Sequence, residues 1–91
     1  MFKALSDPTR REILRLLKRS DLTAGAIAEN FSMSKPSVSH HLSALKAAGL
    51  VDATRRGQEI VYSLNTTVAQ DAMAGLFELF GPTEEEERDD E

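Results

Sequence analysis

The chain has 91 residues, which suits a single domain with a small hydrophobic core. It contains no cysteine, which excludes disulfides, thiolate metal sites and thiol redox chemistry. The net charge of −4 divides unevenly: residues 82–91 hold seven of the fifteen acidic residues and one of the eleven basic ones, so residues 1–81 are mildly basic.

The first predicted helix follows a short helical lead-in over residues 1–5. Asp7 is a good N-cap and Pro8 fits the first helical position, so the helix is expected from there to about Lys18. Its expected buried side consists of Ile13, Leu14, Leu16 and Leu17. Its exposed basic side consists of Arg10, Arg11, Arg15, Lys18 and Arg19. We interpret that basic side as solvated surface in preference to a DNA contact.

A second, shorter helix follows a break at residues 21–23. Thr23 can cap it, and its apolar positions support a helix over residues 24–30. Residues 31–33 then form a tight turn before the next helix begins. A short helix, a tight turn and a further helix together predict a helix-turn-helix unit.

Residues 34–49 form the predicted helix with the clearest ends. Ser34 is a good N-cap, and Pro36 falls in the first turn, where a missing N–H costs nothing. Gly49 can close the C-terminal end in a left-handed conformation. The apolar residues that recur at helical spacing, and that we expect to face the core, are Val38, Leu42 and Leu45.

The outward face of this helix carries hydroxyl, imidazole and ammonium groups, and no carboxylate lies between Ser34 and Gly49. Such groups suit contacts with DNA phosphates and base edges. The alternative is an ordinary amphipathic helix with a solvated polar face. The neighbouring elements favour DNA binding, since this helix would be the second of a helix-turn-helix.

A β-hairpin is predicted directly after this helix. Residues 50–54 and 60–64 are β-prone, and the five residues between them include Gly57, which is a hairpin signal. Arg55 and Arg56 make its tip basic, so the hairpin can meet phosphate or a minor groove as the wing of a winged helix. The alternative is that both arginines only keep the tip hydrated.

The last predicted helix opens at residues 65–67 and continues to Phe80. Thr67 and Gln70 have the spacing of a capping box, and Gly75 would let another backbone approach closely. Its apolar residues exceed what one small core can cover, so we predict the main dimer interface here, with the first helix alongside. Burial within the monomer is the alternative. The predicted interface residues are Leu5, Val68, Ala72, Met73, Gly75, Leu76, Phe77 and Phe80.

Together these elements predict a mainly α fold with a small β-hairpin, an α+β winged helix-turn-helix with about five helices and a two-stranded wing. Residues 1–81 would form the DNA-binding and dimerisation domain, and residues 82–91 an acidic tail that we expect to be disordered. No apolar run approaches membrane-spanning length, and charged residues come too early for a signal peptide. We therefore expect a cytoplasmic protein that does not insert into a membrane.

Three segments resemble the ArsR/SmtB family of winged-helix repressors: ALSDPTRREILRLL, SKPSVSHHLSALKAAGLV and RRGQEIVYSLN. The resemblance covers about residues 2–80. It implies a homodimer paired through its first and last helices, which binds an imperfect palindrome and represses a small operon, often including its own gene. Within the family, SKPSVSHHL and YSLNTTVAQD are most similar to the autorepressor branch of the sporulation-delaying-protein immunity system. That branch implies release from DNA by a membrane-embedded sequestering partner.

Many members of this family release DNA when metal binds, and here the sequence departs from the pattern. It has no cysteine for a site at the helix-turn-helix, and the last helix offers only Asp71 and Glu78. His40 and His41 are adjacent, so they point about 100° apart and cannot easily chelate one ion. We therefore expect no metal site and no cofactor.

The predicted function is a homodimeric, sequence-specific repressor on a palindromic double-stranded DNA operator, autoregulatory and not metal-gated. An enzyme is not expected, because Ser39 and His40 are adjacent on a helix and do not face inward as a nucleophile–base pair. RNA is disfavoured because the chain lacks stacking aromatics on an exposed sheet. The alternative is a winged-helix protein-interaction dimer with weak or no specific DNA binding.

The expected DNA contacts fall into two layers. The residues expected at phosphates are Lys35, Ser39, Lys46, Arg55 and Arg56. The residues expected nearest the base edges of the major groove are Ser37, His40 and His41. Ser34, at the start of the helix, and Gln58, in the wing, complete the predicted DNA-binding set.

Overall fold

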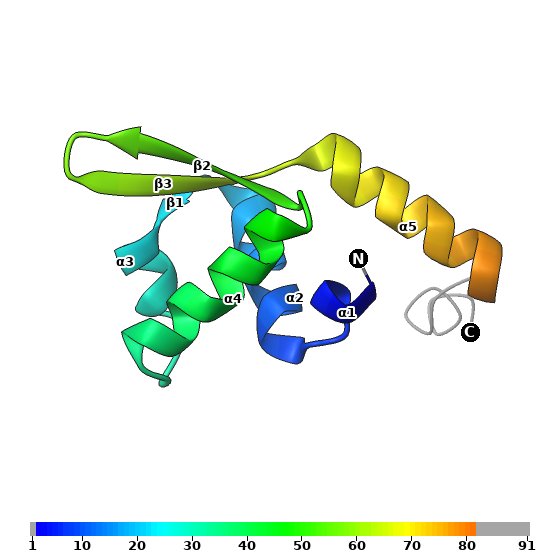
Figure 1. The fold of residues 1–91 in the computed structure, drawn as a ribbon, viewed down its shortest axis with the longest axis horizontal. Coiled ribbons are helices and arrows are strands. Elements are labelled where there is room, and N and C mark those ends of the chain that lie inside the picture. The colour runs from blue at the N-terminus through cyan, green and yellow to red at the C-terminus, as the bar shows by residue number, and fades with distance from the viewer. Residues whose placement is uncertain (1, 82–91) are drawn as a thin grey trace.

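The computed structural model describes residues 2–81, and the predicted acidic tail lies outside them. The chain forms, in order, α1 (Phe2–Leu5), α2 (Pro8–Arg19), β1 (Leu22–Thr23), α3 (Ala24–Ala28), α4 (Lys35–Ala47), β2 (Val51–Arg56), β3 (Glu59–Leu64) and α5 (Thr66–Phe80). The predicted α+β winged helix-turn-helix is confirmed. The β2–β3 hairpin projects from one end of the molecule and α5 from the other (Figure 1).

The helix starts are set by side-chain caps that the sequence predicts. Asp7 Oδ1 accepts hydrogen bonds from the backbone N–H of Thr9 at 2.8 Å and of Arg10 at 3.2 Å. Thr23 Oγ1 accepts from the N–H of Ala26 at 3.1 Å at the start of α3. These bonds satisfy N–H groups that the first turn of a helix leaves without partners. α3 ends at Ala28, two residues before the predicted end.

The ends of α4 also follow the prediction. Ser34 Oγ accepts from the N–H of Ser37 at 3.3 Å, and Pro36 lies in the first turn. Gly49 has a φ of 78°, the left-handed conformation that closes a helix at little steric cost. The apolar stripe of α4 is buried in the core, as predicted. The buried core residues are Ala4, Ile13, Leu17, Ile27, Val38, Leu42, Leu45, Leu50 and Val51.

The sheet has three strands in the order β1-β3-β2, whereas the sequence predicted two. Residues 21–23 were expected as a break, but Leu22 pairs with Tyr62 and Thr23 with Val61. A two-residue strand is too short to show a period-2 pattern, so it forms because β3 offers a free edge. The pairing ties the start of α3 to the wing.

The hairpin connection is shorter than predicted. β2 continues to Arg56 and β3 begins at Glu59, so the turn consists of Gly57 and Gln58 and not of five residues. Gly57 has a φ of 63°, which the first position of a two-residue hairpin turn requires. Arg55 and Arg56 consequently lie in strand β2, where successive side chains point to opposite faces of the sheet.

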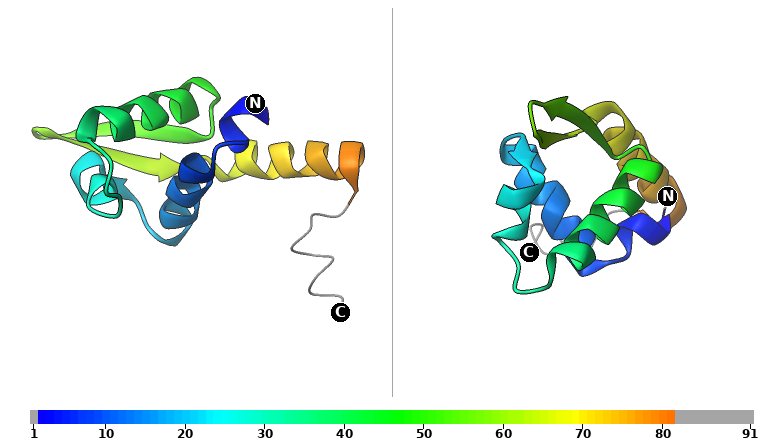
Figure 2. Two further views of the ribbon diagram at one scale, coloured as in Figure 1. Left: turned by 90° about the horizontal axis from the view of Figure 1, so that it is seen from below. Right: turned by 60° about the vertical axis from the view of Figure 1, so that its left-hand side comes forward.

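The cap of α5 differs from the predicted capping box. Asn65 Oδ1 accepts from the N–H of Val68 at 3.1 Å, so Asn65 is the N-cap and Thr67 lies inside the first turn. α5 makes fewer contacts with the other helices and strands than they make with one another. Figure 2 shows α5 extending away from the other elements, which leaves much of its surface uncovered by the described chain.

Candidate nucleic-acid interface

The N-terminal half of α4 presents a polar face. Ser34, Lys35, Ser37, Ser39 and His40 are all exposed there. The hydroxyl groups of Ser34 and Ser37 lie 3.0 Å apart and share a hydrogen bond. No carboxylate is present on α4, so an approaching phosphate meets hydroxyl, ammonium and imidazole groups without an opposing charge on the same helix.

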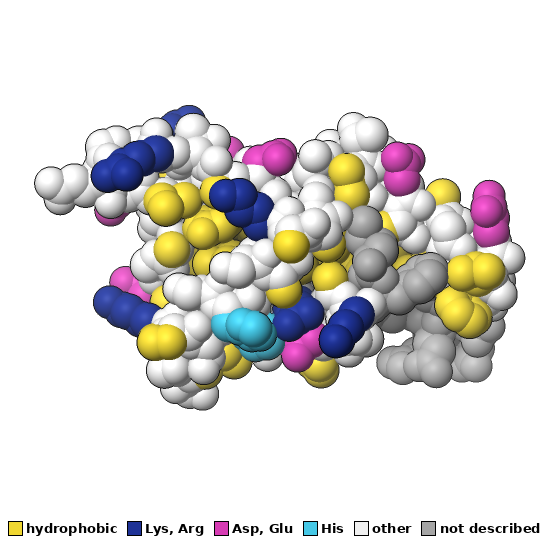
Figure 3. Space-filling model, viewed as in Figure 1, with side chains coloured by type: hydrophobic (Ala, Val, Ile, Leu, Met, Phe, Trp, Pro, Cys, Tyr) yellow, Lys and Arg dark blue, Asp and Glu magenta, His cyan; other side chains and the backbone are white. Residues whose placement is uncertain are grey.

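The two histidines have different surroundings although they are adjacent. Their ring centroids are 6.1 Å apart and the rings are inclined by 61°. His40 is exposed, whereas His41 is half-buried and accepts a hydrogen bond at Nδ1 from Nε of Arg10, at 3.1 Å. Figure 3 shows the histidine side chains beside basic and acidic side chains on this face of the molecule.

Asp7 is the acidic group next to these residues. Its pKa is lowered chiefly by the hydrogen bond from the backbone N–H of Arg10, and further by the N–H of Thr9 and the charges of His41 and Arg10, while desolvation opposes the shift. Asp7 therefore stays ionised at neutral pH and partly offsets the positive charge of Arg10.

The wing carries the remaining predicted DNA contacts except Lys46. Arg55 Nε donates to the carbonyl of Gly57 at 3.2 Å, so this side chain folds against the turn. In the register of the hairpin, Arg56 lies opposite Glu59. Its side chain points to the opposite face of the sheet from that of Arg55. Gln58 lies exposed in the turn. The two arginines are therefore both exposed, on opposite faces of the hairpin.

The wing and the start of α4 lie toward the same end of the molecule, away from α5 (Figures 1 and 2). Lys46 is exposed in the last turn of α4, eleven positions from Lys35 and so about 16 Å along the helix. The structure thus brings the N-terminal half of α4 and the wing to one end, and places Lys46 apart from that group.

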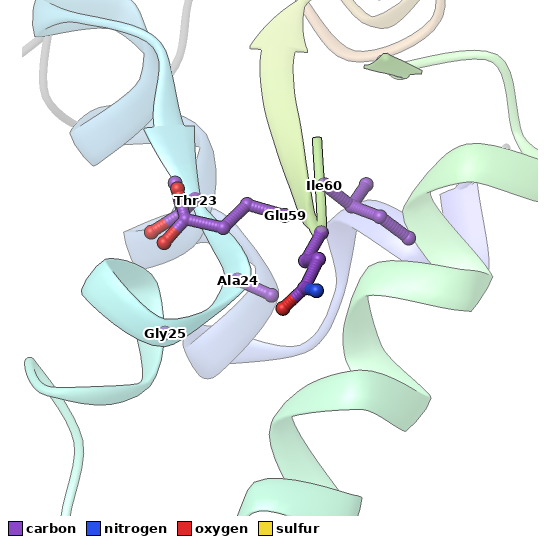
Figure 4. A pocket seen from close by; sticks show the side chains of 6 residues that line it. Thr23, Ala24, Gly25, Glu59 and Ile60 are labelled. Carbon is purple, nitrogen blue, oxygen red and sulfur yellow. The ribbon is translucent and has the colours of Figure 1, made fainter. Parts of the chain in front are cut away.

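A hollow of about 300 Å³ lies between the start of α3 and the wing. In Figure 4 the Glu59 side chain extends from β3 toward Thr23. The Thr23 hydroxyl is already occupied as the cap of α3. The lining holds one carboxylate and no nucleophile–base pair among the described residues, so it does not have the composition of an active site.

A second, larger hollow of about 720 Å³ lies between α2 and α5. Its apolar lining includes Leu5, Leu14, Met73 and Phe77. The large exposed apolar side chains of α5 are Met73 (43% exposed) and Phe77 (36%), which line the hollow, and Leu79 (63%) and Phe80 (76%), which do not. Of the predicted interface residues, Val68 packs against the core and Ala72 is buried, while Gly75 and Leu76 are half-buried.

Within residues 2–81, no group of three or more histidine, cysteine, aspartate or glutamate side chains is arranged to hold a metal ion. In the same part of the chain, no helix has the length and apolar character needed to cross a membrane.

This arrangement defines a winged helix-turn-helix DNA-binding domain: α3 and α4 form the helix-turn-helix, and the β2–β3 hairpin forms the wing. The sequence model described as "Bacterial regulatory protein, arsR family" matches residues 7–53. The chain belongs to this family. It is therefore a DNA-binding transcriptional repressor and not an enzyme.

Relatives and solved structures agree with this assignment. The chain is 63% identical over 73 residues to the transcriptional repressor SdpR of Bacillus subtilis, an overlap that covers 80% of this chain and 81% of that protein. The crystal structure of a possible transcriptional regulator for arsenical resistance matches with a TM-score of 0.81 at 32% identity, covering 90% of this chain and 84% of that one. An ArsR-like transcriptional regulator from Rhodococcus sp. RHA1 matches with a TM-score of 0.74 at 37% identity, covering 86% and 74%.

Two features of the surface were absent from the predicted sites. Arg10 was interpreted as solvated surface, but it contacts the predicted base reader His41. The sequence gives no local signal for this contact, because the partners lie 31 positions apart. Leu79 was omitted from the predicted interface although it is more exposed than Met73 or Phe77; the apolar character of α5 could have indicated it.

Proposed function

We propose that the protein is a homodimeric repressor that binds a palindromic operator, including the control region of its own gene, and that metal does not release it. The observation that carries this proposal is the exposed, acid-free face at the start of α4, at the same end of the molecule as the basic wing. A repressor must share the compartment of its operator, so a cytoplasmic location remains part of the proposal.

The DNA contacts would divide into two layers. Lys35, Ser39 and Lys46 on α4 would bind phosphates and so set the affinity and its dependence on salt. Arg55 and Arg56 would do the same from the wing. The base edges would be read by Ser37, His40 and His41 in the major groove. Ser34 and Gln58 lie exposed at the edges of this surface.

Exposed apolar surface on α5 supports the homodimer. Phe77, Leu79 and Phe80 expose large side chains on a helix that packs little against the rest of the chain. Large apolar side chains that stay exposed on one helix indicate an interaction site. Leu5 of α1 lines the same hollow as Phe77, which supports the prediction that the first helix lies alongside α5 in the interface.

The symmetry of such a dimer predicts the shape of the operator. A closed dimer uses the same surface on both subunits, so two α4 helices related by a two-fold axis would read two inverted half-sites. Their centres would lie roughly 34 Å apart, one helical turn of DNA. An imperfect palindrome is the DNA sequence that suits this geometry.

We do not expect a metal ion to release the protein from DNA, because its residues do not suit a metal site. The chain has no thiolate, and its two histidines sit side by side on the face assigned to DNA. Release by a membrane-embedded sequestering partner stays a prediction of the family resemblance. Its test is whether membranes from cells that express such a partner remove the protein from operator DNA.

Fluorescence anisotropy with the DNA upstream of the protein's own gene tests the proposal. We expect binding that is tighter than to a scrambled duplex, that weakens steeply as salt rises, and that does not change when zinc is added. Release by zinc would contradict the exclusion of metal gating. Equal affinity for both duplexes at every salt concentration would instead favour a protein-interaction dimer.

A further inference from the structure

One side-chain hydrogen bond joins α2 to the DNA-reading helix. Nε of Arg10, in the first turn of α2, donates to Nδ1 of His41 on α4 at 3.1 Å. Within residues 2–81, no other side chain–side chain hydrogen bond connects two different helices. The contact is partly buried, so water competes with it less than with an exposed bond.

The cap of α2 fixes the donor in place. Asp7 Oδ1 accepts from the backbone N–H of Arg10 as well as from that of Thr9. The backbone of Arg10 is thus held in the first helical turn, and its side chain leaves that turn toward α4. Asp7 therefore places Arg10, and Arg10 in turn contacts His41.

This contact decides which nitrogen of His41 carries the proton. The guanidinium of an arginine is always protonated in proteins and has no acceptor, so Nε of Arg10 can only donate. Nδ1 of His41 must then be the acceptor and cannot carry a proton. A neutral imidazole has one N–H, which must be at Nε2, on the other side of the ring from Arg10.

We propose that Arg10 is a positioning residue for operator recognition: by occupying Nδ1 it holds His41 in the Nε2–H form, which offers DNA a hydrogen-bond donor and no acceptor. The inference rests on the proposed function, in which this face of α4 meets the operator. An Nε2–H donor selects phosphate oxygens, N7 or O6 of guanine, N7 of adenine and O4 of thymine. It does not pair with the amino groups of cytosine or adenine.

A purely structural role for His41 makes a different prediction. If His41 only braces α4 against α2, any acceptor at the position of Nδ1 is sufficient. In His41→Asn, the amide oxygen can take the place of Nδ1 opposite Arg10, but no group reaches the position of Nε2. This variant separates a brace from a donor to DNA.

The tautomer is measured first, on the full-length protein without DNA. Long-range proton–nitrogen NMR spectra of protein labelled with ¹⁵N-histidine distinguish Nδ1–H from Nε2–H. We expect Nε2–H for His41 in the wild type, and a larger share of Nδ1–H in Arg10→Met, which keeps an unbranched side chain but has no hydrogen-bond donor. Arg19→Met, the same change at the exposed other end of α2, is the matched control and should leave the tautomer unchanged. An Nδ1–H form in the wild type, or an unaltered tautomer in Arg10→Met, would overturn the proposal.

The variants are then compared by fluorescence anisotropy on the upstream DNA. His41→Asn should lose about tenfold in affinity, the usual effect of one lost base or phosphate contact. Arg10→Met should also bind more weakly, in proportion to its loss of the Nε2–H form. Arg19→Met removes the same charge from α2, so any affinity that Arg10→Met loses beyond Arg19→Met reports the change at His41 and not the lost charge. Wild-type affinity in His41→Asn would show that His41 is only a brace. A wild type with no operator preference would overturn the proposed function itself. The NMR result, measured without DNA, would still decide the tautomer of His41, so the two failures can be told apart.

Discussion

His40 is the exposed member of the histidine pair on α4, with its ring free of the Arg10 contact that His41 makes. We expect His40→Ala to weaken binding to the operator by about 1–3 kcal/mol while leaving scrambled DNA almost unaffected, because a lost base contact removes discrimination and not general attraction. Anisotropy titrations on both duplexes measure the two changes. A parallel loss on operator and scrambled DNA would exclude base reading by His40.

Arg56 is predicted to act through charge alone. Its side chain is exposed in the wing and has no ion pair with Glu59 across the hairpin in the described structure. Arg56→Ala should therefore weaken operator and scrambled DNA alike and reduce the slope of log affinity against log salt by about one contact. An unchanged salt slope would show that Arg56 does not bind a phosphate.

The start of α2 links stability to pH through Asp7. Its pKa lies below the ordinary value of 3.8, mainly because the N–H of Arg10 donates to the carboxylate. A folded-state pKa below the unfolded one adds stability that is fully present above the ordinary value and is lost as the pH falls through the folded value. The capping of α2 is therefore weakest in acid.

Asp7→Asn keeps an N-cap oxygen but removes the charge. We expect this variant to be less stable than the wild type at pH 7, with the difference shrinking as the pH falls below 3.8. Urea unfolding followed by circular dichroism at several pH values measures it. A stability difference that stays constant down to the most acid condition would show that the charge of Asp7 contributes nothing.

The elements differ in how far the sequence could predict them, and the difference follows the range of the interactions. Asp7, Thr23 and Ser34 cap helices within three residues of themselves, so the sequence shows both partners. The apolar stripe of α4 was predictable for the same reason.

Features that depend on distant partners were missed or misplaced. Strand β1 exists only because β3 lies beside it, and the contact of Arg10 with His41 depends on how α2 packs against α4. The hairpin connection was predicted too long because Arg55 and Arg56 look like loop residues, although the ladder of β2 with β3 continues through both. Local sequence does not contain this information.

At the scale of the whole molecule, the exposed apolar surface of α5 predicts association. Phe80→Glu places a charge where we expect contact with a second subunit, and Phe80 is exposed enough that the monomer should still fold. We expect the dimer to weaken by about 2 kcal/mol or more, as for a buried aromatic at an interface centre, with a fall in operator affinity. Analytical ultracentrifugation measures the association.

Thr67→Glu is the matched control, since it adds the same charge at an exposed position near the start of α5, within the same helix. It should associate as the wild type does. If Phe80→Glu associates equally well, this end of α5 is not part of the interface.

Half-site spacing gives the sharpest test of a symmetric dimer that reads DNA through two α4 helices. Once a footprint has located the operator, five base pairs are inserted between its half-sites, which turns one half-site by about half a helical turn relative to the other. Anisotropy should then show binding close to that of an isolated half-site. An insertion of ten base pairs keeps both half-sites on the same side of the DNA but separates them beyond the reach of one dimer, so it should weaken binding as well. If the five-base-pair insertion leaves the affinity unchanged, the protein does not bind as a dimer that engages both half-sites.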